Sequence, residues 1–180
     1  MKFFLAIASR IDALNERVGR TVFWLVLITV LICAMNAIVR KLFNVSSNAF
    51  LEIQWYLFAA VFLLAAGYTL KHDAHVRIDV IFGKLSVRGQ ALINVVGSLF
   101  FLLPLAVLMV WHGWPIFAGS FASAEMSADA GGLLRWPVKL LVPLGFALLG
   151  LQAIAEVIKN LAVLTGNRAP SPAETTMVDH

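Results

Sequence analysis

The sequence predicts an all-α integral membrane protein with four transmembrane helices, an N-terminal amphipathic interfacial helix and short surface helices in the loops. Hydrophobic residues make up 61% of the 180 residues and charged residues only 13%, whereas a soluble domain carries about a quarter charged residues. Four apolar segments are close to the roughly 20 residues that a membrane-spanning helix needs. The alternation expected of a β-barrel is absent, so the backbone must be paired inside helices.

The N-terminal segment predicts an amphipathic helix that precedes the first span. Between residues 3 and 18 apolar side chains recur at helical spacing, and the charged residues fall largely elsewhere. Such a helix lies in the membrane interface with its apolar face toward lipid. The apolar positions are Phe3, Phe4, Ile7, Ile11, Leu14 and Val18. Because no clean cleavage site follows, we expect the first span to be retained as the insertion signal.

Four uncharged or nearly uncharged runs define the predicted spans. The fourth run has a short charge-free centre, so we extend it with Arg135 and Lys139 reaching the headgroups by snorkelling. We expect residues 1–166 to form one four-helix membrane domain and residues 167–180 to form a disordered cytoplasmic tail, because the tail is rich in small and polar residues. The spans cover about residues 21–40, 50–70, 89–111 and 133–158.

The distribution of basic residues predicts the orientation. If the N-terminus is cytoplasmic, ten of the 14 Lys and Arg residues lie inside, and only Arg40, Lys41, Arg135 and Lys139 lie outside. This excess agrees with the positive-inside rule and predicts that both termini are cytoplasmic. The net charge of +4 therefore reflects membrane orientation and not nucleic-acid binding, since the basic residues form no separate domain.

Two loops are expected to contain short surface helices. The inside loop at residues 71–88 has apolar residues among its charges, and the outside loop at residues 111–132 has aromatic residues at helical intervals. Aromatic side chains suit the headgroup layer. Within the spans, Pro104 and Pro143 are expected to kink their helices. Gly145 and Gly150, with Ala147, would let another helix pack closely.

No ionisable residue lies at the centre of a predicted span, where such residues usually mark a functional site. Asn36 and Asn94 lie nearer span ends and are expected to hydrogen-bond between helices. His72 and His75, with two nearby aspartates, are too few for a metal site and predict a hydrogen-bond network. His112 stands alone, which disfavours haem. We therefore expect no catalytic, cofactor or metal site.

Glu52 has two interpretations. As an acid in the first turns of the second span, it is favoured by the helix dipole, with Asn48 as N-cap and Arg40 or Lys41 as ion-pair partner. Alternatively, it contacts a partner subunit or an external binding protein. The residues alone favour the first interpretation.

Four stretches in this order carry a family resemblance. They are Asn36-Ala37-Ile38-Val39-Arg40, Leu51-Glu52-x-x-Trp55-Tyr56, Gly67-Tyr68-Thr69-Leu70 followed by His75-Val76-Arg77-Ile78-Asp79, and Gly131-Gly132-Leu133-Leu134-Arg135-Trp136-Pro137-x-Lys139. With these stretches, over roughly residues 15–162, the chain resembles the small, DctQ-like membrane subunit of tripartite ATP-independent periplasmic (TRAP) transporters.

The resemblance implies a non-catalytic subunit of a sodium-coupled importer of organic acids, such as 2-oxo acids or dicarboxylates, in the bacterial inner membrane. Its implied partners are a large DctM-like membrane subunit that holds the sodium and substrate sites, a periplasmic substrate-binding protein, and membrane lipid. The implied interface or structural residues are Arg40, Lys41, Glu52, Trp55, His75, Arg77, Asp79, Arg135 and Lys139. Contact with the binding protein is a hypothesis for Arg40 and Lys41.

Two other classes of protein fit the sequence less well. A membrane-anchor subunit of a redox enzyme would need paired histidines within its spans, and these are absent from the sequence. A small self-associating channel or exporter would need a polar face on its spans, which is also absent.

Overall fold

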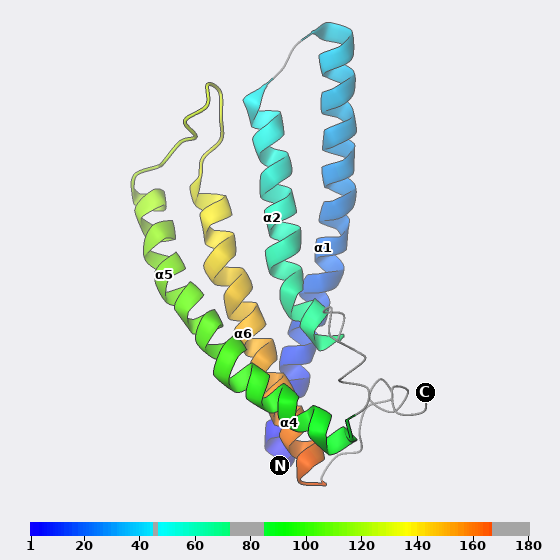
Figure 1. The fold of residues 1–180 in the computed structure, drawn as a ribbon. Helices are drawn as coiled ribbons and strands as arrows, with labels where there is room; N and C mark the ends of the chain where they lie inside the picture. Colours follow the sequence, from blue (N-terminus) through cyan, green and yellow to red (C-terminus); the bar gives the residue numbers. More distant parts are fainter. Residues whose placement is uncertain (45–46, 73–84, 167–180) are drawn as a thin grey trace.

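Long helices account for most of the residues that the computed structural model describes, which are 1–44, 47–72 and 85–166 (Figure 1). Within this part of the chain, four helical rods are long and apolar enough to cross a membrane. The predicted all-α fold class is therefore confirmed. The elements are α1 (Lys2–Phe43), α2 (Asn48–Lys71), α4 (Val87–Gly97), a π-helical turn (Ser98–Leu102), α5 (Leu103–Ala122) and α6 (Trp136–Leu164).

The first rod, α1, is one continuous helix of 42 residues. At 1.5 Å per residue it is about 60 Å long, twice the thickness of the hydrocarbon core. Residues 3–18 are thus the first turns of α1 and not a separate helix. Several of their polar side chains contact α2 and α6, whereas Phe3 and Phe4 are exposed.

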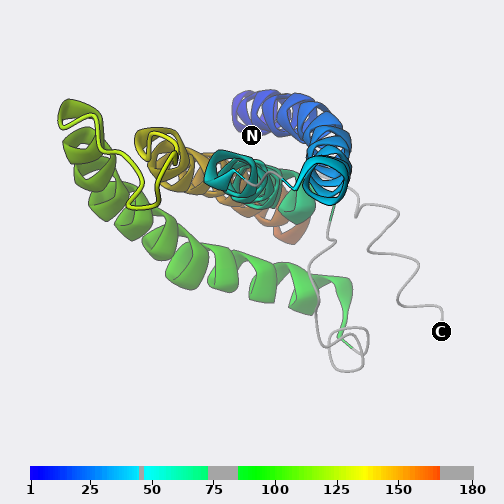
Figure 2. The same cartoon turned by 90° about the horizontal axis from the view of Figure 1, so that it is seen from above.

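The third rod consists of α4, the π-turn and α5. The π-turn lies just before Pro104, which has no backbone N–H and cannot donate to the carbonyl four residues earlier. A π-turn accommodates such a break without ending the helix. The rod curves along its length (Figure 2), as expected from the proline. The surface helix predicted outside belongs to this rod, because α5 continues to Ala122.

The last helix, α6, lies at the centre of the bundle and makes contacts with α1, α2, α4 and α5. In its most apolar stretch 44% of the residues are buried, compared with 6% in α1. A Cβ at Gly145 would lie 2.7 Å from the Leu63 carbonyl oxygen, and one at Gly150 would lie 3.2 Å from the Ala106 Cβ. The predicted close packing at these glycines therefore occurs within the chain, against α2 and α5.

Candidate functional site

The loop between α5 and α6 (residues 123–135) is an ordered structure at one end of the bundle. The Ser127 N–H donates to the Leu133 carbonyl and the Arg135 N–H donates to the Glu125 carbonyl, both at 2.9 Å. These bonds form a narrow antiparallel pair that turns through Gly131, whose φ of +73° is a conformation that glycine adopts freely. We call residues 123–135 the outer loop.

Glu52 in the second turn of α2 anchors the outer loop. Its side chain accepts a hydrogen bond of 2.7 Å from the Leu133 N–H and another from the Ser127 hydroxyl. The residue is only 7% exposed, so these donors replace the water that the carboxylate loses. Any Cβ at Gly132 would lie 2.9 Å from Glu52 Oε1, which explains why a glycine occupies that position.

This arrangement corrects two predictions about the start of α2. Glu52 is held by the outer loop and not by Arg40 or Lys41, and neither of these basic residues forms an ion pair with another described residue. Ser47, and not Asn48, is the N-cap of α2. The Asn48 side chain instead donates to the Ala130 carbonyl at 2.9 Å. Asn48 and Glu52 therefore both bind α2 to the outer loop.

The basic residues at the start of α6 complete the network. Lys139 forms an ion pair with Glu125, and the Arg135 guanidinium lies 3.5 Å from the Ser127 hydroxyl oxygen. The hydrogen bond from Lys139 lowers the pKa of Glu125 below its ordinary value. Three residues predicted from the sequence, Glu52, Arg135 and Lys139, are thus brought into one cluster.

The other predicted residues lie apart from this cluster. Arg40 and Lys41 are exposed in the last turn of α1. Trp55 is 73% exposed on α2. His75, Arg77 and Asp79 lie outside the described residues.

A second polar network joins α1 to α6 at the opposite end of the bundle. The side-chain amide of Gln152 is fully buried; it donates to Asp12 at 2.7 Å and accepts from Asn15 at 2.9 Å. Lys159 lies 3.1 Å from Asp12 and 2.5 Å from Glu156. These bonds satisfy groups that would be costly to bury alone.

Glu16 extends this network to α2. Its carboxylate lies 2.7 Å from Lys71 Nζ and 2.9 Å from His72 Nε2, and Arg20 on the next turn of α1 donates to it at 2.9 Å. The network predicted around His72 therefore includes a residue of α1. Asn94 reaches Asn160 of α6 at 3.5 Å, as predicted for an interhelical contact, whereas Asn36 makes no side-chain hydrogen bond to another described residue.

Sequence reasoning missed this second network. Asp12, Asn15 and Glu16 have the spacing of one helical face, and Gln152, Glu156 and Lys159 repeat it on α6. The sequence predicts only that the charged residues of the segment 3–18 lie off its apolar face. In the structure Asp12 and Asn15 bond to Gln152 and Lys159 of α6, and Glu16 bonds to Lys71 and His72 at the end of α2. Among the described residues, no three potential metal-ligating side chains are grouped.

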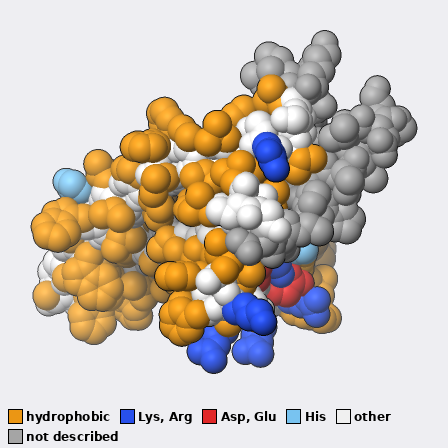
Figure 3. Space-filling model, turned by 90° about the horizontal axis from the view of Figure 1, so that it is seen from below, with side chains coloured by type: hydrophobic (Ala, Val, Ile, Leu, Met, Phe, Trp, Pro, Cys, Tyr) orange, Lys and Arg blue, Asp and Glu red, His pale blue; other side chains and the backbone are white. Residues whose placement is uncertain are grey.

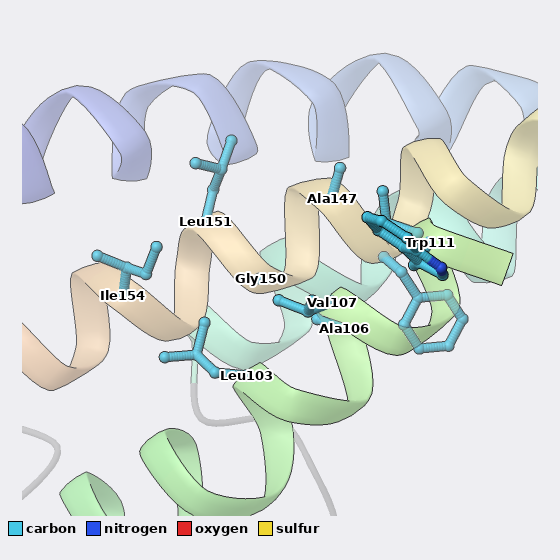
Figure 4. Close-up of a pocket in the computed structure, with 10 residues that line it drawn as sticks. Leu103, Ala106, Val107, Trp111, Ala147, Gly150, Leu151 and Ile154 are labelled. Atoms are coloured by element: carbon cyan, nitrogen blue, oxygen red, sulfur yellow. The ribbon is translucent and has the colours of Figure 1, made fainter. Parts of the chain in front are cut away.

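An apolar groove of about 420 Å³ lies between α5 and α6 (Figure 4). Its walls include Leu103, Val107, Trp111, Leu151 and Ile154. An organic anion needs polar or charged partners to replace its hydration, and the lining side chains supply almost none. This groove therefore suits a hydrocarbon chain or an apolar side chain and not an organic acid.

Taken together, the apolar rods and the polar networks at their ends define a multi-pass membrane protein. The family model for the DctQ component of tripartite ATP-independent periplasmic transporters matches residues 28–163. The chain belongs to this family and is a small, non-catalytic permease subunit of a TRAP transporter. Membership of the family implies partnership with a large subunit and a binding protein.

One relative shows the extent of the similarity. The chain is 27% identical over 136 residues to the ectoine TRAP transporter small permease protein TeaB of Halomonas elongata. The matched region covers 73% of this chain and 69% of the relative. No solved structure matches the chain.

Proposed function

We propose that this chain is the small subunit of a sodium-coupled TRAP transporter that imports an organic acid, such as a 2-oxo acid or a dicarboxylate. The observation that carries the proposal is the family match over residues 28–163. The apolar lining of the α5–α6 groove supports it as well, because a substrate anion would then be bound by another subunit. The chain's own role is to widen and position the membrane scaffold.

The proposed location is the bacterial inner membrane with both termini in the cytoplasm. The start of α1 and the end of α6 lie at the same end of the bundle (Figure 1). Ten of the 14 Lys and Arg residues belong to that end by the order of the spans. The positive-inside rule therefore supports a cytoplasmic position for it.

We place the contact with the large subunit on α2. Leu51, Trp55, Phe58 and Phe62 are exposed and follow the three- and four-residue spacing of one helical face. Aromatic residues on such a face offer large contact areas to a partner helix. In the most apolar stretch of α2 only 11% of the residues are buried within the chain, which leaves this face available.

Substitution of Trp55 tests this placement. W55A combined with F62A is expected to reduce co-purification of the large subunit at least several-fold, with helix content unchanged. The matched control is W111A, because Trp111 on α5 is 75% exposed and Trp55 is 73% exposed. Equal losses for both variants would contradict a specific contact on α2.

The proposed docking surface for the periplasmic binding protein is the outer loop with Arg40 and Lys41. Glu52 supports this surface indirectly, because it holds the loop in place and is itself buried. Arg40 and Lys41 are exposed and so can meet an acidic partner surface. Charge reversal by R40E is expected to lower uptake and binding-protein capture, while R40K keeps both. Unchanged uptake with R40E would exclude Arg40 from docking.

The function as a whole is tested by reconstitution. The large subunit, with or without this chain, is placed in liposomes with the binding protein outside, and uptake is measured with and without an inward sodium gradient. A 2-oxo acid, a dicarboxylate and ectoine serve as candidate substrates. We expect uptake only with the gradient and only when this chain is present. Transport undiminished by omitting the chain would refute the proposed role.

A further inference from the structure

A charged hollow of about 470 Å³ lies on α1 near the start of the bundle, beside the end of α2. Asp12, Glu16, Arg17 and Arg20 of α1 and Lys71 of α2 line it. Seen from this end, basic side chains lie beside acidic ones on a surface that is otherwise largely hydrophobic (Figure 3). The hollow itself is therefore lined mainly by charged side chains of both signs.

The acidic groups of the hollow are already paired. Glu16 accepts from Lys71, His72 and Arg20, and Asp12 is bound by Lys159 of α6. Because both carboxylates are paired with basic side chains, little negative charge remains in the hollow to repel an anion.

The arginines of the hollow, by contrast, retain free donors. Arg17 forms no ion pair with any described residue. Arg20 uses only its Nε for Glu16, and its side chain is 75% exposed. An arginine guanidinium presents a fork of N–H donors that matches two phosphate oxygens. Hence the hollow has spare donors for a phosphate group.

The helix face that carries the arginines becomes apolar immediately beyond them. Trp24, Leu27 and Leu31 follow Arg20 at steps of four, three and four residues, so they share its face. Their exposures are 68%, 48% and 55%. A tryptophan between charged and aliphatic residues is typical of the membrane–water interface. The face therefore has the order of a phospholipid, with headgroup donors first and hydrocarbon contacts after them.

We propose that this hollow and the adjoining face of α1 bind an anionic glycerophospholipid, with its phosphate at Arg17 and Arg20 and an acyl chain along Trp24, Leu27 and Leu31. The lipid belongs to the cytoplasmic leaflet in the proposed orientation, where anionic headgroups attract basic residues. The proposal depends on that orientation for the leaflet but not on the transported substrate.

Native mass spectrometry of the delipidated full chain in detergent tests the proposal. Phosphatidylglycerol is titrated against phosphatidylcholine with identical acyl chains, and we expect phosphatidylglycerol to bind more tightly. Each arginine near a headgroup contributes about five-fold in affinity, so R17Q/R20Q should weaken phosphatidylglycerol by roughly 25-fold. The binding of phosphatidylcholine should weaken less, because its choline ammonium already offsets the charge of its phosphate. R17K/R20K should lose less affinity than R17Q/R20Q, because the charges remain although the paired donors of the guanidinium are lost.

The matched control is R10Q, which removes one exposed arginine of α1 outside the hollow and should leave phosphatidylglycerol binding unchanged. Equal affinity for the two lipids, or an unchanged affinity in R17Q/R20Q with native helix content, would overturn the proposal. Displacement of the lipid by glycerol phosphate would show a site for free phosphate instead. If R17Q/R20Q lost the large subunit and kept the lipid, this face would be a protein interface. If the termini proved to lie outside and the lipid still bound, only the assignment of the lipid to the cytoplasmic leaflet would be wrong.

Discussion

Glu52 shows how one carboxylate can organise a long loop. Its two oxygens receive a backbone N–H and a hydroxyl from the outer loop, and the loop in turn packs over the start of α2. A charged acceptor with two donors is worth more than a neutral one. The residue therefore acts as a structural support for the surface proposed to meet the binding protein.

Replacing Glu52 by glutamine is expected to loosen the outer loop. One oxygen becomes an NH2 group that cannot accept from Ser127 or Leu133, which should cost about 1–3 kcal/mol. Thermal unfolding in detergent and proteolysis within the loop would measure the change. D129N is the control: Asp129 is exposed in the same loop, so this substitution should leave the thermal stability unchanged. Identical melting curves for E52Q and the parent protein would contradict the anchoring role.

The Glu125–Lys139 ion pair predicts a dependence of stability on pH. Lys139 lowers the pKa of Glu125 in the folded protein below the ordinary 4.5. The resulting stabilisation is therefore complete above pH 4.5 and is lost as the pH falls through the lowered value. The melting temperature of E125Q should be lower than that of the parent protein near neutral pH, and the gap should narrow below pH 4.5. A gap independent of pH would contradict this assignment.

Among the elements, α6 determines the packing through its small residues. At Gly145 an added Cβ would meet backbone atoms of Leu63, which cannot move without shifting α2. G145A is therefore expected to lower the free energy of unfolding by about 1–3 kcal/mol. G119A is the matched control, because a Cβ at Gly119 of α5 meets nothing within 4 Å and alanine favours helix. Equal effects of the two variants on thermal stability would refute the close contact.

The contact between α1 and α6 depends on Gln152. Q152L would leave the Asn15 amide without its interhelical partner and would remove one of the donors to Asp12, which keeps Lys159; the expected cost is about 1–3 kcal/mol. Q54L is a suitable control, because Gln54 donates only to a carbonyl of its own helix. Hydrogen exchange in the first turns of α1 should rise in Q152L and stay constant in Q54L. Unchanged exchange in Q152L would show that α1 is held by other contacts.

The elements themselves could be predicted from the sequence, whereas most of their contacts could not. Apolar length identifies a membrane helix without any knowledge of its neighbours. Glu52, however, bonds residues 75 and 81 positions away, and no spacing rule connects them. For α1, the helical period shows that Asp12, Asn15 and Glu16 share a face. It does not show whether that face meets water or other helices, and here Asp12 and Asn15 meet α6 while Glu16 meets α2.

At the scale of the whole molecule, the distribution of Lys and Arg predicts that both termini lie in the cytoplasm. Reporter fusions test it: a fluorescent protein that folds only in the cytoplasm should be active at either terminus, and alkaline phosphatase, active only outside, should be inactive there. A phosphatase inserted in the outer loop should be active. The opposite pattern would reverse the topology and with it the proposed docking end.

The order of the helices along the chain has a consequence for how the protein is made. The helix that contacts all the other described helices, α6, is synthesised after them. Until it emerges from the ribosome, α1 and α2 can pair with each other, but α4 and α5 have no main partner. Membrane insertion can therefore proceed helix by helix while assembly waits for residue 136 and beyond. A premature stop codon between α5 and α6 would leave α4 and α5 inserted without their main packing partner, and such a chain would be a substrate for membrane proteases.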